Sequence, residues 1–195
     1  MKKENMQRLK KRLLTLLKQK AFKKGKFVLS SGKTSNYYLD GRLITLDAEG
    51  AYLIASLILD MIKRDKIDAV GGPTLGADPI VGALAALSYI NKKPLKTFIV
   101  RKTPKTHGMN RQIEGPALKK GERVVLVDDV ATTGEALMEA KQALSVTSAK
   151  IVKVIVVVDR CEGAKENLAK EGLKLESIFS RSEIIQEAGI ADFGI

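Results

Sequence analysis

Residues 128–134, Asp-Asp-Val-Ala-Thr-Thr-Gly, combine two adjacent carboxylates with a small, hydroxyl-bearing turn. They follow the apolar run 124–127 and precede an expected helix that begins near Glu135. Such a turn is typical of phosphate binding, because exposed N–H groups and the positive end of the helix dipole face the anion. The carboxylates of Asp128 and Asp129 would repel phosphate, so they suit uncharged hydroxyl groups beside it, with or without a divalent cation. The segment therefore predicts a site for a ribose next to its 5-phosphate.

Two other interpretations of the acidic pair are open at this point. Asp128 could cap a loop while Asp129 is solvated, and adjacent aspartates also occur at the Mg²⁺ sites of receiver-type and phosphatase domains. The small residues that follow the pair, at positions 131–134, favour the phosphate-binding interpretation.

A second segment, residues 101–111, is rich in positive charge. It holds four Lys and Arg residues and the only histidine of the chain, His107, with no acidic residue among them. A connection of this length exceeds the roughly 2–6 residues usual in α/β units, and long loops commonly carry function. We expect it to surround a highly anionic group such as a diphosphate through charge-assisted hydrogen bonds. The alternative is a solvated surface loop.

Two further segments follow expected strands. The turn at residues 71–76, Gly-Gly-Pro-Thr-Leu-Gly, allows a backbone to approach a ligand closely, although packing alone could explain its glycines. Arg160 follows the strand that ends at Asp159 and could pair with a substrate carboxylate. An ordinary surface ion pair between Arg160 and Glu162 or another acid is the alternative.

The elements that must position these segments follow from the apolar pattern. We expect a basic helix at the N-terminus, a hairpin around residues 27–39, and a helix capped by Asp47 that runs to about Lys63. Strands are expected at residues 67–71, 97–100, 123–127 and 151–158, and helices at residues 79–90 and 135–144. Asp78 is expected to cap the first of these helices, with Pro79 in its opening turn. The continuous β-branched runs indicate strands buried on both faces, as in a parallel sheet covered by helices. The fold class is therefore α/β, with ligands expected at the carboxyl ends of the strands.

Composition limits the protein classes. The chain has 195 residues, 45% of them hydrophobic, which suits one ordinary globular domain. No apolar run approaches the roughly 20 residues of a membrane span. One cysteine, Cys161, excludes an internal disulfide and fits a reducing cytoplasm, and one Cys with one His excludes a zinc cluster.

The net charge of +12 is concentrated at one end of the chain. Residues 1–26 hold eleven Lys and Arg residues against Glu4 alone. A nucleic-acid-binding domain would spread its excess charge over the folded surface. We interpret this segment as a helix with a solvated basic face and an apolar stripe that docks on the protein, and an anionic partner is the alternative.

The two chemically rich segments resemble those of a known family. Residues 124–134 are similar to the phosphoribosyl diphosphate (PRPP) motif of type I phosphoribosyltransferases. Residues 100–108, followed by Ile113-Glu114-Gly115, resemble the mobile catalytic loop of the orotate phosphoribosyltransferases, and residues 31–38 resemble their N-terminal hood. The resemblance spans about Phe27 to Arg160, with the motifs in the expected order.

The resemblance implies an Mg²⁺-dependent transfer of ribose 5-phosphate from PRPP to orotate, in the synthesis of UMP, by a homodimer in which the loop at residues 101–115 reaches the neighbouring site. It implies Lys105 and His107 as catalytic residues. The implied PRPP-binding residues are Arg101, Lys102, Lys105, His107, Asp128, Asp129, Val130, Ala131, Thr132, Thr133, Gly134, Glu135 and Ala136. Orotate would contact Thr132, Arg160 and Tyr38, with Arg160 on its carboxylate. The metal would be held mainly by the diphosphate and the ribose hydroxyls, with Asp128 and Asp129 nearby.

The resemblance also implies a type I phosphoribosyltransferase-like fold, in which a mainly parallel sheet is flanked by helices. Residues 1–45 would form the hood and residues 46–195 the core, within a single structural domain, and the C-terminal segment is a further candidate for completing the hood. The chain departs from many bacterial members at Ser30 and Gly76, where they carry lysine, so Lys33 or another basic residue would supply that charge. Two rival functions are a purine phosphoribosyltransferase and a PRPP-sensing regulator that binds RNA or DNA.

Overall fold

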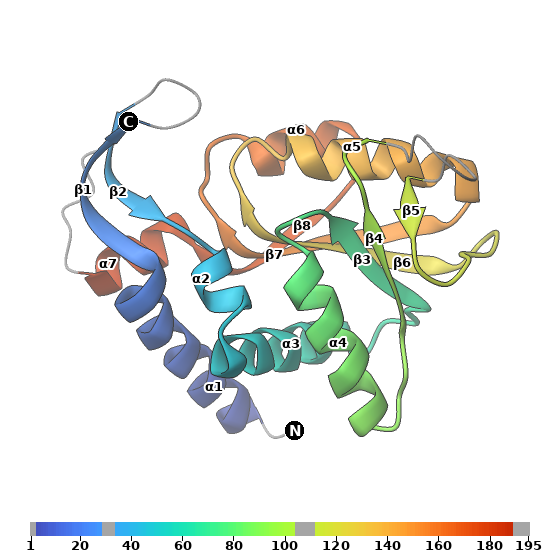
Figure 1. Cartoon of the computed structure of the whole chain (residues 1–195), viewed down its shortest axis with the longest axis horizontal. Helices are drawn as coiled ribbons and strands as arrows, with labels where there is room; N and C mark the ends of the chain where they lie inside the picture. The colour runs from blue at the N-terminus through green and yellow to red at the C-terminus, as the bar shows by residue number, and fades with distance from the viewer. Residues whose placement is uncertain (1–2, 29–33, 104–111, 189–195) are drawn as a thin grey trace.

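A six-stranded sheet forms the centre of the molecule (Figure 1). The computed structural model describes residues 3–28, 34–103 and 112–188. The strand order in the sheet is β5-β4-β3-β6-β7-β8, and only β5 runs antiparallel to its neighbour. The strands of this sheet are β3 (Ala69–Pro73), β4 (Lys96–Val100), β5 (Ile113–Glu114), β6 (Arg123–Ala131), β7 (Lys150–Asp159) and β8 (Leu175–Ser180). The predicted α/β class with a mainly parallel sheet is confirmed.

Helices cover both faces of the sheet, as the buried apolar runs of its strands require. One apolar cluster joins the sheet to α1, α3 and α4, and a second joins its other face to α5 and α6. The helices are α1 (Lys3–Leu16), α2 (Arg42–Thr45), α3 (Ala48–Ile62), α4 (Asp78–Ile90), α5 (Glu135–Leu144), α6 (Ala164–Lys170) and α7 (Arg181–Ala188), with a π-helical turn η1 (Leu17–Ala21) and a 3₁₀ turn η2 (Ser145–Thr147). No helix in the described ranges has the length and the apolar character needed to cross a lipid bilayer.

Strand β6 is longer than the apolar pattern predicts. The expected strand ends at Val127, whereas β6 continues through the two aspartates to Ala131. The reason is its neighbour β7, which pairs Val158 with Val130 and Asp159 with Ala131. The acidic pair therefore lies on a strand at the carboxyl edge of the sheet, and the turn that follows it is only three residues long.

The helix starts show one correct and one wrong prediction. The Asp47 carboxylate accepts the Gly50 N–H at 2.9 Å and caps α3, as expected. Asp78 is not a cap: it is the first residue of α4, Ala77 holds the capping position, and no side-chain cap hydrogen bond is made there. One carboxylate oxygen of Asp78 is instead buried without a hydrogen-bond partner.

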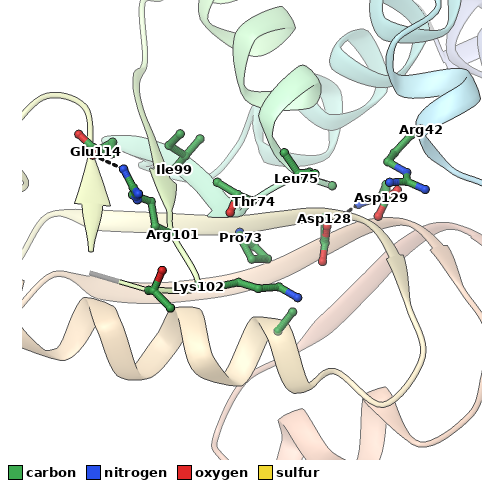
Figure 2. A pocket seen from close by; sticks show the side chains of 13 residues that line it. Arg42, Pro73, Thr74, Leu75, Ile99, Arg101, Lys102, Glu114, Asp128 and Asp129 are labelled. Carbon is green, nitrogen blue, oxygen red and sulfur yellow. Dashed lines mark hydrogen bonds and ion pairs between the residues drawn. The ribbon is translucent and has the colours of Figure 1, made fainter. Parts of the chain in front are cut away.

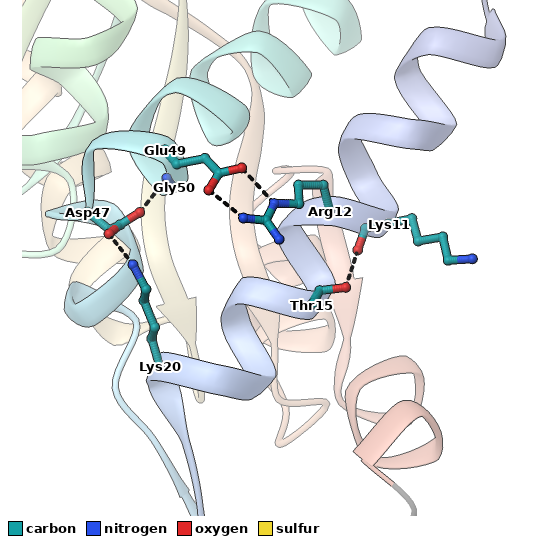
Figure 3. Close-up of polar contacts among 7 residues, drawn as sticks. All are labelled: Lys11, Arg12, Thr15, Lys20, Asp47, Glu49 and Gly50. Carbon is teal, nitrogen blue, oxygen red and sulfur yellow. Dashed lines mark hydrogen bonds and ion pairs between the residues drawn. The ribbon is translucent and has the colours of Figure 1, made fainter.

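The N-terminal segments lie beside the large sheet. Strands β1 (Phe22–Val28) and β2 (Thr34–Leu39) form a two-stranded antiparallel sheet, which confirms the hairpin. Strand β1 begins earlier than expected, because residues 22–26 pair with β2 and do not continue the N-terminal helix. Helix α1 buries its leucines against α3, and some of the basic residues of α1 and η1 form ion pairs (Figure 3). Arg12 donates two hydrogen bonds to Glu49 at 2.6 and 2.7 Å, and Lys20 pairs with Asp47 at 2.5 Å.

These ion pairs give part of the positive charge at the N-terminus a structural role. Lys10 also pairs with an acid, Glu183 of α7, at 2.8 Å, whereas the Lys11 side chain points away from the contacts drawn in Figure 3. The Arg12 guanidinium holds the pKa of the Glu49 carboxyl below its ordinary value. Part of the charge of this segment therefore attaches α1 to α3 and α7, which agrees with a docking helix.

Candidate active site

A cavity of about 900 Å³ lies at the carboxyl ends of β3, β4 and β6 (Figure 2). This is the edge at which ligands bind in open parallel sheets. Its wall is formed by Arg42, Pro73, Thr74, Leu75, Gly76, Ile99, Arg101, Lys102, Thr103, Glu114, Asp128, Asp129 and Ala136. The cavity thus brings together the acidic pair, the start of the basic segment and the Gly-Pro turn, as predicted from the sequence.

The turn after β6 has its backbone direction set by hydrogen bonds. Arg160 N–H donates to the carbonyl of Ala131 at 3.0 Å, Ala164 N–H to that of Thr132 at 3.2 Å, and the Asn167 side-chain amide to that of Thr133 at 3.1 Å. Three consecutive carbonyl groups are therefore bound by the segment that leads into and includes α6.

This arrangement determines where the N–H groups of the turn point. The peptide bonds here are trans, and in a trans peptide the C=O of one residue and the N–H of the next point in opposite directions. The N–H groups of Thr132, Thr133 and Gly134 therefore face away from α6. Gly134 adopts the left-handed conformation (φ 81°) directly before α5. Three aligned N–H groups at a helix start form a cradle for an anion.

The two carboxylates before this turn are held by their own backbone. Asp128 is buried, with 8% of its surface exposed, and accepts the Asp129 N–H at 2.9 Å, while Asp129 accepts the Val130 N–H at 2.7 Å. Burial raises the pKa of both carboxyl groups, that of Asp128 well above its ordinary value, and the charge of Asp129 raises the pKa of Asp128 further. Asp78 contributes in the same direction. The pair is thus costly to keep ionised, which is typical of functional carboxylates.

Two glycines lie against the acidic pair. A Cβ atom added at Gly76 would come within 2.2 Å of Asp128 Oδ1 and 2.5 Å of Asp129 Oδ1. A Cβ atom added at Gly41 would come within 2.7 Å of Asp129 Oδ2. The carboxylate of Asp129 is therefore enclosed by two backbone segments, one before α2 and one in the turn between β3 and α4. The peptide bond between Thr74 and Leu75 in the second turn is cis.

The basic wall of the cavity is described only in part. The Arg101 side chain pairs with Glu114 of β5 at 3.5 Å, and the Arg101 backbone N–H donates to the backbone carbonyl of Gln112 at 2.8 Å. Lys102 is exposed beside it. Lys105 and His107 lie outside the described residues, as do Ser30 and Lys33, so their predicted roles stay predictions.

Arg160 does not line this cavity, although its backbone is hydrogen-bonded to the end of β6. Its side chain is 8% exposed, its Nε atom lies 2.9 Å from Glu162 Oε1, and its guanidinium lies 5.7 Å from the ring centroid of Tyr37. The expected alternative, an ion pair with Glu162, is therefore present, but it is largely covered by the protein: the two side chains are 10% and 12% exposed. Tyr38 is exposed and lies against the Phe27 ring at 5.5 Å.

The predicted site residues within the described ranges fall into two groups. Arg101, Lys102, Asp128, Asp129 and Ala136 line the cavity, whereas Val130–Glu135, Arg160 and Tyr38 lie outside its wall. Among the charged residues of the wall, Arg42, the first residue of α2, lies in none of the segments that the sequence interpretation singled out. The only signal for it in the sequence is a basic residue two positions after Asp40, next to the hairpin.

The carboxylates of this site suit a metal ion that is held in part by a bound substrate. Asp128 and Asp129 offer the oxygen donors that Mg²⁺ prefers. Within the described ranges, no three His, Cys, Asp or Glu side chains form a group able to bind a metal by themselves. Mg²⁺ commonly binds through one or two carboxylates together with substrate phosphates, and the residues present fit that arrangement.

Comparisons with known proteins agree on one family. The family model for the phosphoribosyl transferase domain matches residues 44–189. The chain is 47% identical over 177 residues to the orotate phosphoribosyltransferase of Aquifex aeolicus, covering 91% of this chain and 93% of that protein.

Solved structures agree as well. A Mycobacterium tuberculosis orotate phosphoribosyltransferase in complex with Fe(III) dicitrate matches with a TM-score of 0.80 and 35% identity, over 90% of this chain and 98% of that one. The same organism's enzyme in complex with PRPP matches with a TM-score of 0.75 and 32% identity, with the same coverage.

Proposed function

The chain belongs to the phosphoribosyltransferase family, and from this premise we infer that it is an orotate phosphoribosyltransferase. Such an enzyme transfers ribose 5-phosphate from PRPP to N1 of orotate, giving orotidine 5′-phosphate and diphosphate, in the synthesis of pyrimidine nucleotides. The observation that carries this function is the placement of an anion cradle shortly after a buried carboxylate, Asp128, and a half-buried one, Asp129, at the edge of the sheet. A ribose 5-phosphate carries both kinds of group side by side: hydroxyl groups for the carboxylates and an anion for the cradle.

The cradle and the acidic pair bind different parts of PRPP. The N–H groups of residues 132–134 and the positive end of the α5 dipole bind the 5-phosphate. Asp128 and Asp129 accept hydrogen bonds from the ribose hydroxyls, and these bonds are strongest when the carboxyl groups are ionised. Because the turn is already hydrogen-bonded to the α6 segment, little ordering is needed when the phosphate arrives.

The leaving group is handled by the basic wall. Breaking the bond between C1 of the ribose and the diphosphate oxygen leaves positive charge on the sugar and adds negative charge to the diphosphate. Arg101, Lys102, Lys105 and His107 interact most strongly with that negative charge in the transition state, and such interactions raise kcat. Bound Mg²⁺ would neutralise further charge on the diphosphate. Closing the basic segment over the site would exclude water, which otherwise hydrolyses PRPP.

The enzyme is further proposed to act as a homodimer in the cytoplasm. Exposed apolar side chains on the α2–α4 part of the surface support an interface between subunits. They are Leu43, Leu46, Tyr52, Leu75, Tyr89 and Ile90. The segment at residues 101–115 would then reach the site of the partner subunit. The single cysteine of the chain agrees with a reducing compartment.

The reaction itself is tested by incubating the protein with PRPP, Mg²⁺ and orotate and following the loss of orotate absorbance. We expect turnover with orotate, no turnover with purine bases, and loss of activity when EDTA removes the metal. Turnover with a purine alone would establish the purine rival. Tight nucleic-acid binding with a steep salt dependence and no turnover would establish the regulator.

Orotate recognition is tested at Arg160. If its guanidinium binds the orotate carboxylate, Arg160→Ala should raise the KM for orotate about 10-fold or more while the KM for PRPP changes little, since charge-assisted hydrogen bonds contribute about 1.5–3 kcal/mol. Steady-state kinetics with each substrate varied in turn measures both constants. Equal changes in the two constants would remove this assignment.

The Arg160 variant needs a stability control, because it leaves the buried Glu162 carboxylate without its partner. Adding Glu162→Gln to Arg160→Ala removes that unpaired charge. The double variant should regain thermal stability but keep the raised KM for orotate, which separates recognition from folding.

A further inference from the structure

Arg42 is a cation on the cavity wall that none of the predicted motifs contains. It is the first residue of α2, at the junction between the small N-terminal sheet and α3. Its side chain is 51% exposed, and Figure 2 shows it beside Asp129, at the opposite end of the cavity from Arg101 and Glu114. The cavity wall thus carries positive charge at both ends.

Asp40 fixes the direction of this side chain. The Arg42 Nε atom lies 3.2 Å from Asp40 Oδ1 and its Nη2 atom 3.4 Å from Asp40 Oδ2, and the Arg42 backbone N–H also donates to Asp40 Oδ1 at 3.1 Å. A guanidinium has five N–H donors, so this pair leaves others for a ligand. Exposed ion pairs of this kind contribute little to stability, so folding alone does not account for an arginine at this position.

The acidic pair limits which other residue could place positive charge here. Position 76 faces the same carboxylates from the turn between β3 and α4, but a side chain there would collide with Asp128 and Asp129. The lining cations of the described wall are Arg42, Arg101 and Lys102, and Arg101 lies at the other end of the cavity, beside Glu114. Burial raises the pKa of the Asp129 carboxyl, and the nearby charge of Arg42 partly offsets this. Arg42 therefore supplies the positive charge at the Asp129 end of the cavity.

The chemistry of PRPP indicates which group Arg42 meets. The acidic pair holds the ribose hydroxyls, and the carbon next to the 2-hydroxyl carries the diphosphate. The 5-phosphate lies at the other end of the sugar, at residues 132–134. A cation next to Asp129 is therefore placed for an anion attached to C1. We propose that Arg42, oriented by Asp40, binds the diphosphate group of PRPP from the side opposite to Arg101 and Lys102. This inference rests on the proposed function.

The test compares two ligands that differ at C1. PRPP carries a diphosphate there, whereas orotidine 5′-phosphate carries the base and has no diphosphate. Titration calorimetry with Mg²⁺ should show that Arg42→Ala raises the Kd for PRPP about 10-fold or more, with the Kd for orotidine 5′-phosphate unchanged within about 2-fold. Arg42→Lys should recover part of the PRPP affinity, and Asp40→Asn should weaken PRPP binding less than Arg42→Ala does.

Arg12→Ala is the matched control, because Arg12 is also an exposed arginine paired with one acid but lies on α1, outside the cavity wall. It should leave both Kd values unchanged. If Arg42→Ala does not fold, Arg42→Gln replaces it in the same titrations.

Each outcome separates this inference from the proposed function. Unchanged PRPP affinity in a folded Arg42 variant, with wild-type turnover of orotate, would overturn the inference alone. An equal loss of affinity for both ligands would place Arg42 on the 5-phosphate or the base and would also overturn it. A wild-type protein that binds no PRPP would overturn the proposed function together with the inference.

Discussion

Replacing Lys105 with alanine is expected to lower kcat about 100-fold or more, the usual scale for removing a group that stabilises transition-state charge. Lys105 is the proposed main stabiliser of the departing diphosphate, with His107 assisting. Its effect should fall on kcat, because the charge it contacts grows as the bond at C1 breaks. Steady-state kinetics at saturating PRPP, Mg²⁺ and orotate measures the change.

Lys170→Ala, which removes an exposed lysine at the end of α6, is the control and should keep wild-type turnover. A Lys105→Ala enzyme with wild-type kcat would contradict the role assigned to this residue.

The same variant tests whether the basic segment acts in the partner subunit. A Lys105→Ala chain keeps an intact acidic pair, and an Asp128→Asn chain keeps an intact basic segment. A mixed dimer of the two therefore contains one complete site if the segment crosses between subunits. Mixing and refolding the two variants should give more activity than either alone, and the absence of recovery in a confirmed mixed dimer would place the segment on its own site.

Replacing Asp128 with asparagine is expected to stabilise the ligand-free protein while reducing its activity. The raised pKa of Asp128 means that the folded state disfavours the ionised carboxylate. The stabilising contribution of the protonated form is fully present below the unfolded-state pKa and is lost as the pH rises through the folded-state pKa. Asparagine removes the buried charge and its repulsion with Asp129, and its carbonyl can still accept the Asp129 N–H. We expect a gain of about 1 kcal/mol, or roughly 2–4 °C in Tm, near neutral pH.

The same substitution should lower kcat/KM for PRPP by about 10- to 100-fold, since a hydrogen bond to a charged group is worth about 1.5–3 kcal/mol. Thermal unfolding of the ligand-free proteins between about pH 5 and 8 should show that the stability gain grows as the pH rises. Asp60→Asn, at an exposed ion pair with Lys63, is the control and should change Tm little. An Asp128→Asn variant that is less stable than wild type at every pH would show that the carboxylate is not a cost to folding.

The local signals of the sequence predicted the elements well where a single residue marks the boundary. Gly134 adopts a positive φ at the capping position of α5, and α5 begins at Glu135 and ends at Leu144, as expected. Asp47 caps α3 because its side chain can reach a backbone N–H three residues ahead. Both signals depend on neighbours in the chain.

The errors arose where distant segments decide the structure. The end of β6 depends on the length of β7. Asp78 does not act as a cap because it is already the first residue of α4, where one of its carboxylate oxygens is buried. Arg160 was correctly given Glu162 as one possible partner, but the burial of that pair depends on the fold around it. Arg42 was missed because it reaches the cavity only when the hairpin and α2 pack on the edge of the sheet.

Helix α6 and the residues that lead into it lie on the side of the turn opposite to the proposed phosphate site. Their N–H groups donate hydrogen bonds to the carbonyl groups of residues 131–133. The proposed phosphate-binding turn is therefore held in its shape by the protein itself before any ligand arrives. A substitution at Asn167, whose side chain donates to the Thr133 carbonyl from the α6 side of the turn, is therefore expected to change the shape of the proposed phosphate site.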